Sequence, residues 1–346
     1  MDTNKSKNIF PWKIRDVEPK VARELTKYFK NEHTSYIRVG PKGYFFPHTY
    51  KLEAANIYNM QIRASDVYVA SYPRSGSTWT RELVWIVANN WDFAKSETVP
   101  LVGRFMFLEF PTLVNSQHID KIMSETTDET KLNVLEMITQ PGTARLAMAE
   151  SPRFVYTHLP LSLLPPSLLD TAKVVYVARD PRDVVVSFYH MNRLHRLLGY
   201  RGDMKTFWNF FISDSIYWTP YFENMKEAWA KRHHPNMLFL FYEDMSKDLP
   251  SVIHRVAQFL NKPCSEELVL RLSRHLSIDS FRTNKSVNYN IMDELGLLNH
   301  GEQPYIRKGK AGGWRDHFDD EMTQQAEQWI ADNLRDTDLR FPHMDI

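Results

Sequence analysis

The chain has little cysteine, almost no net charge and no long apolar run. Cys264 is the one cysteine in 346 residues, so no disulfide can form within the chain and a zinc site built on several cysteines is excluded. Lys and Arg number 43 against 42 Asp and Glu, a formal net charge of +1. Nothing overall indicates a nucleic-acid coat or a polybasic membrane anchor. Any anion site must therefore be a local concentration of donors.

The apolar stretches are too short to cross a bilayer. Leu83–Ala88 and Met237–Tyr242 are among the longest. The first residues, MDTNKSKNIF, lack the charged-then-apolar pattern of a signal peptide. The single cysteine fits a reducing compartment, and we expect a cytoplasmic protein. Residues 1–10 are expected to be flexible and residues 11–346 to form a single domain, because no linker-like break divides them.

Short apolar runs alternate with helical patterns along the chain. The expected strands are Val67–Ser71, Phe154–Thr157, Lys173–Ala178 and Met237–Tyr242, none of them cleanly alternating. The expected helices are Thr78–Asn89, one starting at Pro181 with Asp180 as its cap, one through Val252–Leu260, and Asp320–Leu334. Pro41–His48 (PKGYFFPH) is expected to be an aromatic loop, and Ser124–Lys131 a surface segment. Repeated strand, loop and helix predict an α/β fold, a single domain with a central parallel sheet flanked by helices.

The loop after the first of these strands suits a phosphate or sulfate. Tyr72–Trp79 (YPRSGSTW) holds a cation, a glycine and three small hydroxyl residues just before a helix. A helix N-terminus presents free N–H groups and the positive end of its dipole. The sequence is not a Walker A motif, which needs two glycines four residues apart followed by Lys and Ser or Thr. A serine-rich helix start is also often only a cap, so this loop alone leaves both interpretations open.

Other segments add cations and a base. Arg307–Trp314 (RKGKAGGW) places three cations among three glycines, and Arg179 ends the strand Lys173–Ala178. Ligands in doubly wound folds bind at the carboxyl ends of strands, where Arg179 is expected to lie. His158 follows the strand Phe154–Thr157 and is a candidate general base at the same edge. The other histidines show no metal-ligand spacing, so we expect no metal site.

Five segments together resemble the cytosolic sulfotransferase family. They are YPRSGSTW, RFVYTHLPLSLLP, VVYVARDPRDVVVSFYH, LFLFYEDM and RKGKAGGW, in that order. The resemblance is strong from about Val67 to Phe318. SYIRVGPKGY and AANIYNM look most like the insect branch of the family that includes retinol dehydratase.

The resemblance implies 3′-phosphoadenosine 5′-phosphosulfate as sulfuryl donor and no metal. Residues Arg74, Ser75, Gly76, Ser77 and Thr78 would hold the phosphosulfate, with Arg74 also catalytic, and His158 would be the general base. The remaining implied donor contacts are Trp79, Arg179, Ser187, Tyr242, Leu276, Ser277, Arg307, Lys308 and Gly309. The chemistry agrees, because sulfuryl transfer needs a base for the acceptor hydroxyl and positive groups around the leaving phosphate.

The chain departs from the family pattern at three places. Most relatives have lysine at Arg74 and at Tyr156, two residues before the base. Arginine keeps the charge and adds a fork of donors, whereas Tyr156 removes a cation from the acceptor side. The family's C-terminal dimer motif is not matched. The matching positions in this chain are Arg315, Asp319, Asp320 and Gln324, and an aspartate stands where the motif has valine. We therefore expect a monomer or a different dimer.

The acceptor is expected to be a small lipophilic hydroxyl compound: a phenol such as a luciferin-type phenol, an alcohol or a sterol. The predicted lining residues are Tyr44, Phe45, Phe105, Phe107, Tyr156 and Met191. Two alternatives stay open, namely sulfation of an allylic alcohol followed by elimination of sulfate, as in retinol dehydratase, and a carrier of lipophilic ligands without activity. A phosphoryl-transfer enzyme is disfavoured, because neither a Walker A pattern nor an acidic metal pair is present.

Overall fold

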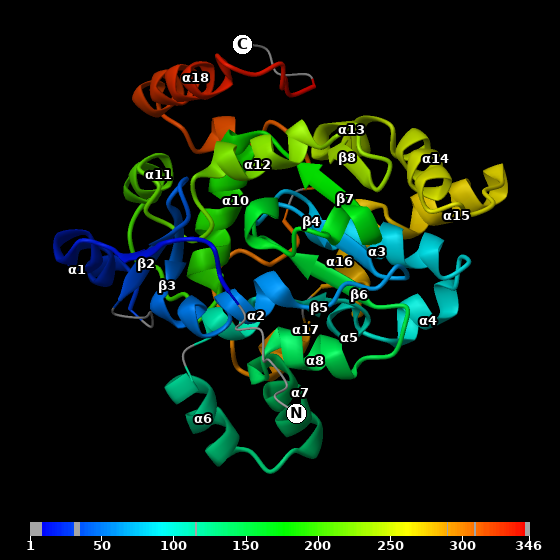
Figure 1. Ribbon diagram of the computed structural model, residues 1–346, viewed down its shortest axis with the longest axis horizontal. Coiled ribbons are helices and arrows are strands. Elements are labelled where there is room, and N and C mark those ends of the chain that lie inside the picture. The colour runs from blue at the N-terminus through cyan, green and yellow to red at the C-terminus, as the bar shows by residue number, and fades with distance from the viewer. Residues whose placement is uncertain (1–8, 31–34, 115, 289, 308, 343–346) are drawn as a thin grey trace, which may run out of the picture.

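A parallel sheet of five strands forms the centre of the molecule (Figure 1). The computed structural model describes residues 9–30, 35–114, 116–288, 290–307 and 309–342. The strands lie in the order β5-β6-β4-β7-β8. Their bounds are β4 (Val67–Ala70), β5 (Met106–Phe107), β6 (Phe154–Thr157), β7 (Lys173–Ala178) and β8 (Met237–Phe241). The four strands predicted from the sequence are confirmed to within one residue at their ends.

Alternate residues of the sheet enter two separate cores. On β7, Val174, Tyr176 and Ala178 join one apolar cluster, while Val175 and Val177 join the other. Both faces are thus covered, which explains why these strands lack the alternating pattern of a half-exposed sheet. The expected single α/β domain with a parallel sheet flanked by helices is confirmed.

Helices cover both faces. One face carries α10 (Pro181–Leu194), α11 (Met204–Ile212), α12 (Tyr221–Ala230) and α18 (Asp320–Leu334). The other carries α3 (Ser77–Ala88), α4 (Phe93–Thr98), α5 (Leu101–Arg104), α14 (Leu249–Phe259), α15 (Glu266–His275) and α16 (Ile278–Thr283). The remaining helices are α1 (Pro19–Tyr28), α2 (Ala54–Asn59), α6 (Ser116–Glu125), α7 (Glu129–Thr139), α8 (Gly142–Met148), α9 (Leu168–Thr171), α13 (Tyr242–Lys247) and α17 (Asn290–Glu294).

Two helix predictions can be followed in detail. The side chain of Asp180 accepts a hydrogen bond from the N–H of Arg182 and caps α10, with Pro181 in the first position. The last helix spans the predicted residues, and Met322, Ala326, Ile330 and Leu334 form its buried face. The first site helix begins at Ser77, one residue before the expected start.

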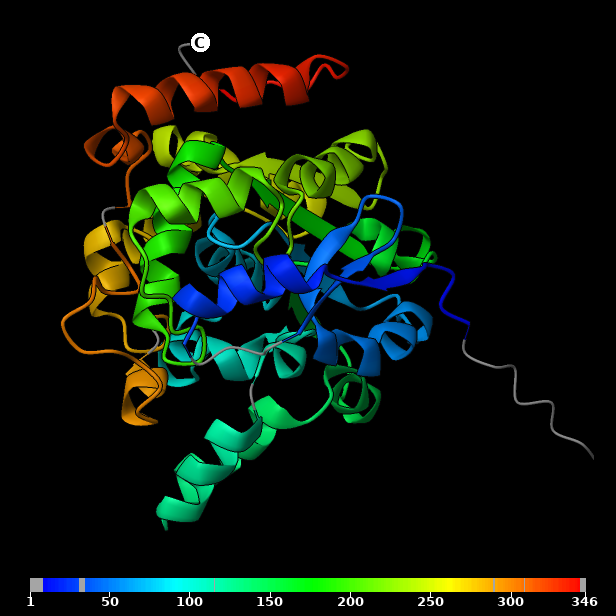
Figure 2. The same ribbon diagram turned by 90° about the vertical axis from the view of Figure 1, so that its left-hand side faces the viewer.

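The expected aromatic loop at Pro41–His48 is wrong. Its second half is the strand β3 (Tyr44–Pro47), which pairs with β2 (Tyr36–Val39) in an antiparallel sheet completed by β1 (Ile14–Asp16). The other edge of β3 is also bonded, because the N–H of Phe45 donates to the main-chain oxygen of Thr219 at 2.8 Å. Pairing with segments that are distant in the sequence thus overrides the loop that the local glycine and proline residues indicate. This small sheet packs on the α10–α12 side of the molecule (Figure 2).

The helices α6 and α7 extend away from the body, as Figures 1 and 2 show. Ser124, Glu125, Thr127 and Asp128 at their junction are exposed, as expected for a surface segment. Their apolar sides form a third cluster with the segment around α17, through Ile119, Leu135 and Met292 among others. Within the described residues, no helix combines the length and apolar character needed to cross a membrane.

The topology gathers four strand ends at one edge of the sheet. The chain passes from β4 outward to β5, returns to β6, crosses to β7 on the other side of β4, and continues to β8. The order therefore reverses at β4, which is where ligands bind in open parallel sheets. The loops that follow β4, β6, β7 and β8 carry the predicted site residues.

Candidate active site

The loop after β4 brings backbone N–H groups and a cation to the sheet edge. Gly76 lies immediately before α3 with φ of 105°, and no side chain caps the helix. The first-turn N–H groups of a helix have no acceptor within it and carry the positive end of the dipole. A Cβ atom at Gly76 would lie 2.8 Å from Cδ2 of Tyr242. Glycine is therefore required both by the backbone angle and by the approach to Tyr242.

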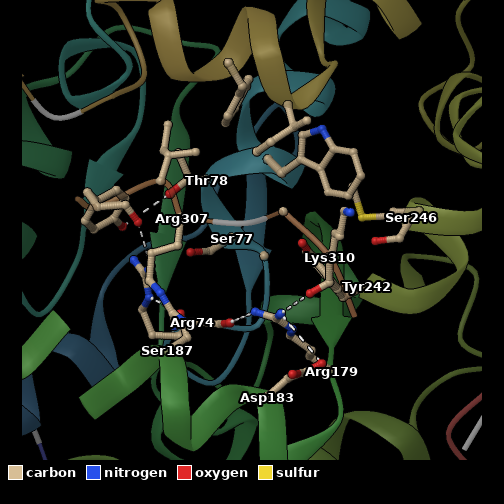
Figure 3. A pocket seen from close by; sticks show the side chains of 18 of the residues that line it. Arg74, Ser77, Thr78, Arg179, Asp183, Ser187, Tyr242, Ser246, Arg307 and Lys310 are labelled. Carbon is tan, nitrogen blue, oxygen red and sulfur yellow. Dashed lines mark hydrogen bonds and ion pairs between the residues drawn. The ribbon is translucent and has the colours of Figure 1, made fainter. Parts of the chain in front are cut away.

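Three guanidinium groups converge on a cavity of about 360 Å³ beside this loop (Figure 3). Arg74 donates from Nε to Oγ of Ser187 at 3.0 Å and from Nη2 to the main-chain oxygen of Tyr305 at 2.8 Å. Arg179 lies over the ring of Tyr242 at 4.1 Å. Burial, together with the neighbouring cations of Arg74 and Arg179, lowers the pKa of Arg307 to about 10. Such crowded like charges are suited to an anionic ligand.

One carboxylate places the glycine-rich loop against the cations. Asp183 accepts hydrogen bonds from the N–H of Gly312 at 2.6 Å and from the N–H of Trp314 at 3.0 Å. Its carboxylate also lies 3.8 Å from Nη2 of Arg179. This acid, on the first turn of α10, therefore anchors the segment that carries Arg307.

Two aromatic rings form part of the cavity wall. The ring of Trp79 lies 5.6 Å from that of Tyr242, and its Nε1 donates to the main-chain oxygen of Leu276 at 3.0 Å. Ser277 follows and caps α16 through the N–H of Ser280. The predicted residues Arg74, Gly76, Ser77, Thr78, Trp79, Arg179, Ser187, Tyr242, Leu276, Ser277, Arg307 and Gly309 all line this cavity. Ser75 is fully buried behind it, and Lys308 lies outside the described residues.

His158 lies between this cavity and a second one, and borders both. Its Nδ1 is 2.8 Å from the main-chain oxygen of Ser71. Because that oxygen can only accept, Nδ1 carries the proton and Nε2 keeps its lone pair. Burial lowers the pKa of His158 to about 3, and the cations of Arg81 and Arg74 act in the same direction. The imidazole is therefore neutral at physiological pH and able to accept a proton.

Sequence reasoning missed Glu109, which holds the backbone of His158. Its carboxylate accepts from the N–H of His158 at 2.7 Å, from the hydroxyl of Thr157 at 2.7 Å and from Nε1 of Trp218 at 3.2 Å. Burial raises the pKa of Glu109 to about 7, although these hydrogen bonds oppose the shift. Trp218 in turn packs edge-on against the His158 ring at 5.3 Å. A single glutamate with no motif around it gives no sequence signal for this role.

The second cavity, of about 110 Å³, is mainly apolar. Of the residues predicted to line an acceptor pocket, Phe105, Phe107, Tyr156 and Met191 do so. Tyr44 and Phe45 do not border it: both are 1% exposed, and the Tyr44 hydroxyl donates to Glu227 at 2.7 Å. Their place in the antiparallel sheet puts them in the core instead, so they are corrected to packing residues.

Tyr156 stands where most members of the resembled family have lysine, but another residue of this chain places a cation beside its ring. The guanidinium carbon of Arg81, on α3, lies 3.8 Å from the centre of the Tyr156 ring. Arg81 also donates to the main-chain oxygen of Ser77 at 3.3 Å and to the Thr78 hydroxyl at 3.2 Å. Positive charge is therefore present beside a residue that lines the second cavity. Tyr305, also missed from the sequence, borders both cavities.

No group of three or more His, Cys, Asp or Glu side chains is placed to hold a metal ion in the described part of the chain. The donors around the first cavity are instead guanidinium, hydroxyl and amide groups. These groups bind oxyanions, and the apolar cavity suits the body of a lipophilic compound. His158 at the junction is in position to take a proton from a group that bridges the two cavities.

Comparison with known proteins gives consistent matches over most of the chain. The family model described as "Sulfotransferase domain" matches residues 64–338. Luciferin sulfotransferase of Photinus pyralis is 34% identical over 321 residues, 91% of this chain and 83% of that protein. The structure of retinol dehydratase in complex with androsterone and the inactive cofactor PAP superposes with a TM-score of 0.90 and 48% identity, over 97% of this chain and 99% of that one. A complex of retinol dehydratase with retinol and PAP gives a TM-score of 0.90 at 47% identity, over 96% and 99% of the two chains.

Proposed function

The chain belongs to the sulfotransferase family, and we propose that it moves a sulfuryl group from 3′-phosphoadenosine 5′-phosphosulfate to the hydroxyl of a small lipophilic acceptor. The two matched complexes contain PAP, the desulfated form of this donor, together with a steroid or retinol. The observation that carries the proposal is the pair of adjoining cavities, one cationic and one apolar, with His158 at their junction.

In this proposal the first cavity binds the donor. Arg74 and the N–H groups at the start of α3 hold the phosphosulfate, while Arg179, Ser187 and Arg307 hold the 3′-phosphate. Trp79, Tyr242, Leu276 and Ser277 surround the adenine, and Lys308 and Gly309 complete the phosphate loop. The fit is supported by the crowded guanidinium groups and by the Trp79 and Tyr242 rings 5.6 Å apart. We propose that no metal is used, because all these donors bind anions rather than cations.

The reaction proposed for the junction is an in-line transfer. Nε2 of His158 accepts the proton of the acceptor hydroxyl as its oxygen forms the new bond to sulfur. The bond between sulfur and the bridging oxygen of the donor breaks, and the electron pair stays with the leaving phosphate. Arg74 and the backbone N–H groups of α3 stabilise the charge that develops there, an effect worth about 3 kcal/mol for one well-placed donor.

The test is a transfer assay with sulfate-labelled donor and a panel of a simple phenol, a luciferin-type phenol, an ecdysteroid and retinol. We expect labelled ester on at least one acceptor, and His158→Ala is expected to lose turnover by about 10²- to 10⁴-fold. The variant should bind donor nucleotide as the wild type does, as calorimetry can measure. Full activity of His158→Ala would remove this residue from the mechanism. Tight nucleotide binding without turnover on any acceptor would favour the inactive carrier.

A second candidate reaction is sulfation followed by elimination. It is favoured by the 48% identity to retinol dehydratase over 97% of the chain. In this version an allylic sulfate ester loses sulfate and a proton, so the net change is dehydration of the alcohol. Release of free labelled sulfate with loss of the acceptor hydroxyl supports it, whereas stable ester in stoichiometric yield excludes it.

Two further properties are proposed with the function. A cytoplasmic location is supported by the single cysteine, which suits a reducing compartment. Assembly through the family's C-terminal dimer motif is not expected. The matching positions hold Asp319 and Asp320, and an aspartate stands where the motif has its apolar valine. Light scattering during gel filtration measures the mass of the assembly and so its oligomeric state. Fluorescence microscopy of cells with labelled protein tests the cytoplasmic location.

A further inference from the structure

Arg145 is a cation on the wall of an otherwise mainly apolar cavity. It extends from α8 into the lining of the second cavity, beside apolar residues such as Phe107 and Ile138, and does not border the first cavity. Burial lowers the pKa of Arg145. An arginine nevertheless stays protonated at neutral pH. The acceptor side of the site therefore holds a fixed positive charge.

This charge has no carboxylate partner among the described residues. The electrostatic neighbour of Arg145 is the phenol of Tyr156 rather than a carboxylate. Four other buried or half-buried arginines are paired with carboxylates: Arg104 with Glu82, Arg153 with Asp66, Arg182 with Asp180 and Arg193 with Glu302. Leaving a partly desolvated charge without a counter-ion costs free energy. Groups of this kind are typical of binding sites.

The helix that carries Arg145 is held firmly. A Cβ atom at Gly142 would lie 2.0 Å from the main-chain oxygen of Leu108, so α8 rests directly on the chain that follows β5. The hydroxyl of Thr143 donates to Glu53 at 2.7 Å, and Arg63 donates to the main-chain oxygens of Ala149 at 2.7 Å and Ala147 at 3.2 Å. A site on a fixed helix positions its donors better than one on a free loop.

The cation lies apart from the reacting end of the cavity. The residues shared by the two cavities, among them Ser77, His158 and Tyr305, mark the junction where the hydroxyl must lie. The Tyr156 ring is 6.0 Å from the His158 ring. Of the two cavities Arg145 borders only the second, so an acceptor with its hydroxyl at His158 meets this cation beyond the junction.

We propose that Arg145 binds an anionic oxygen group, in the simplest case a carboxylate, at the end of the acceptor remote from its reacting hydroxyl. This deepens the proposed function and rests on it. The acceptor class becomes an amphipathic one: a hydroxyl at one end, an apolar middle and an acid at the other end. The guanidinium fork matches a carboxylate with two parallel hydrogen bonds, which gives orientation as well as affinity.

The test compares acceptors that differ only at the remote end. ω-(4-Hydroxyphenyl)alkanoates of increasing chain length are assayed beside the carboxamides of the same lengths. At the length that reaches Arg145, kcat/KM of the wild type should favour the carboxylate by roughly 10- to 100-fold, the effect of one charged hydrogen-bonded pair. Arg145→Met should abolish this preference, and Arg145→Lys should keep part of it. Equal rates for acid and amide at every length, or a preference that survives Arg145→Met, would overturn the proposal.

The controls separate this proposal from folding and from the function itself. Arg232→Met removes the same charge from a half-buried arginine that pairs with Asp338, remote from both cavities, and should leave the preference unchanged. Thermal melting checks that the variants fold. If no phenol is sulfated, calorimetry with ω-phenylalkanoates and their amides still measures the preference, because it needs no transfer. Binding of the acids that is lost in Arg145→Met then supports the proposal, and equal binding of acids and amides overturns it.

Discussion

The Nδ1 atom of His158 lies 2.8 Å from the main-chain oxygen of Ser71, on the neighbouring strand end. The parallel pairing of β4 with β6 sets this contact, because Ala70 lies opposite Thr157 and the next residues leave the sheet together. A backbone acceptor fixes the tautomer without adding a charge to the site. The sheet register thus decides which nitrogen of the imidazole can act as a base.

A direct consequence is that His158 should not titrate near neutrality. Burial lowers its pKa to about 3, so the ring of the ligand-free protein stays neutral from pH 5 to pH 8. The measurement is a nuclear magnetic resonance titration of the imidazole signals, with His158 assigned from the spectrum of His158→Ala. An exposed histidine such as His233 serves as the internal reference signal for the titration. A His158 midpoint between pH 6 and pH 7 would contradict the structure.

Arg74 is expected to matter for turnover through its positive charge. Its Nε and Nη2 atoms already donate to Ser187 and Tyr305, at 3.0 Å and 2.8 Å, so the side chain is fixed at the mouth of the α3 loop. Arg74→Met should lower kcat by about 10²- to 10³-fold, whereas Arg74→Lys, which keeps the charge, should lose much less. Steady-state kinetics measure both. Arg315→Met, which removes a cation that borders neither cavity, is the matched control, and an unchanged kcat in Arg74→Met would refute the role.

Glu109 should make stability fall as the pH rises. Burial raises its pKa from 4.5 to about 7 in the folded protein, so folding favours the protonated form. The stabilisation that the protonated Glu109 gives to the folded protein is fully present below about pH 4.5. It is lost as the pH rises through about 7. Glu109→Gln keeps a neutral side chain of the same shape. The difference in free energy of unfolding between wild type and variant should therefore change by up to about 3 kcal/mol between pH 4.5 and pH 8.

Denaturant unfolding at several pH values measures this difference. Taking the difference between two proteins removes the contributions of other shifted groups, such as Glu243, whose pKa burial also raises to about 7. If the two stability curves ran parallel over that range, the raised pKa of Glu109 would be wrong.

Gly76 should tolerate no side chain. Its φ of 105° strains any other residue, and a Cβ atom would lie 2.8 Å from the Tyr242 ring. Gly76→Ala is expected to destabilise the protein by about 1–3 kcal/mol and to weaken nucleotide binding, since both Gly76 and Tyr242 line the donor cavity. Gly296→Ala separates the two causes, because Gly296 has φ of 70° with nothing within 4 Å of the added atom. Equal nucleotide affinity in both variants would show that the Tyr242 contact does not matter.

The sequence predicted well the sheet and the set of residues around the first cavity, because both are local signals. Runs of apolar residues defined the four longest parallel strands, and motifs at their ends carried Arg74, His158 and Arg179. The antiparallel sheet was not predicted, because Tyr44–Pro47 becomes a strand through partners far away in the chain, such as Thr219. Its glycines and prolines look like a loop when only the neighbours are considered.

The second cavity was predicted less well because it depends on packing. Glu109 acts through three hydrogen bonds that no sequence pattern marks, and Arg145 reaches the cavity wall from α8, far from any motif. Arg81 supplies a cation beside Tyr156 from helix α3, which the segment around Tyr156 does not reveal. Tyr44 and Phe45 were expected at the cavity because they are aromatic, but their strand turns them into the core.

The two hydrogen bonds from Gly312 and Trp314 to Asp183 bear on how the protein is made. They join the last loop of the site to a helix that precedes it by more than a hundred residues. During synthesis on a ribosome the sheet can pair from β4 to β8 while Arg307 is still inside the exit tunnel. Asp183, whose carboxylate lies 3.8 Å from Nη2 of Arg179, is then in place before its two backbone donors have left the ribosome. The loop that carries Arg307 therefore docks last, on a carboxylate that the earlier part of the chain has already positioned.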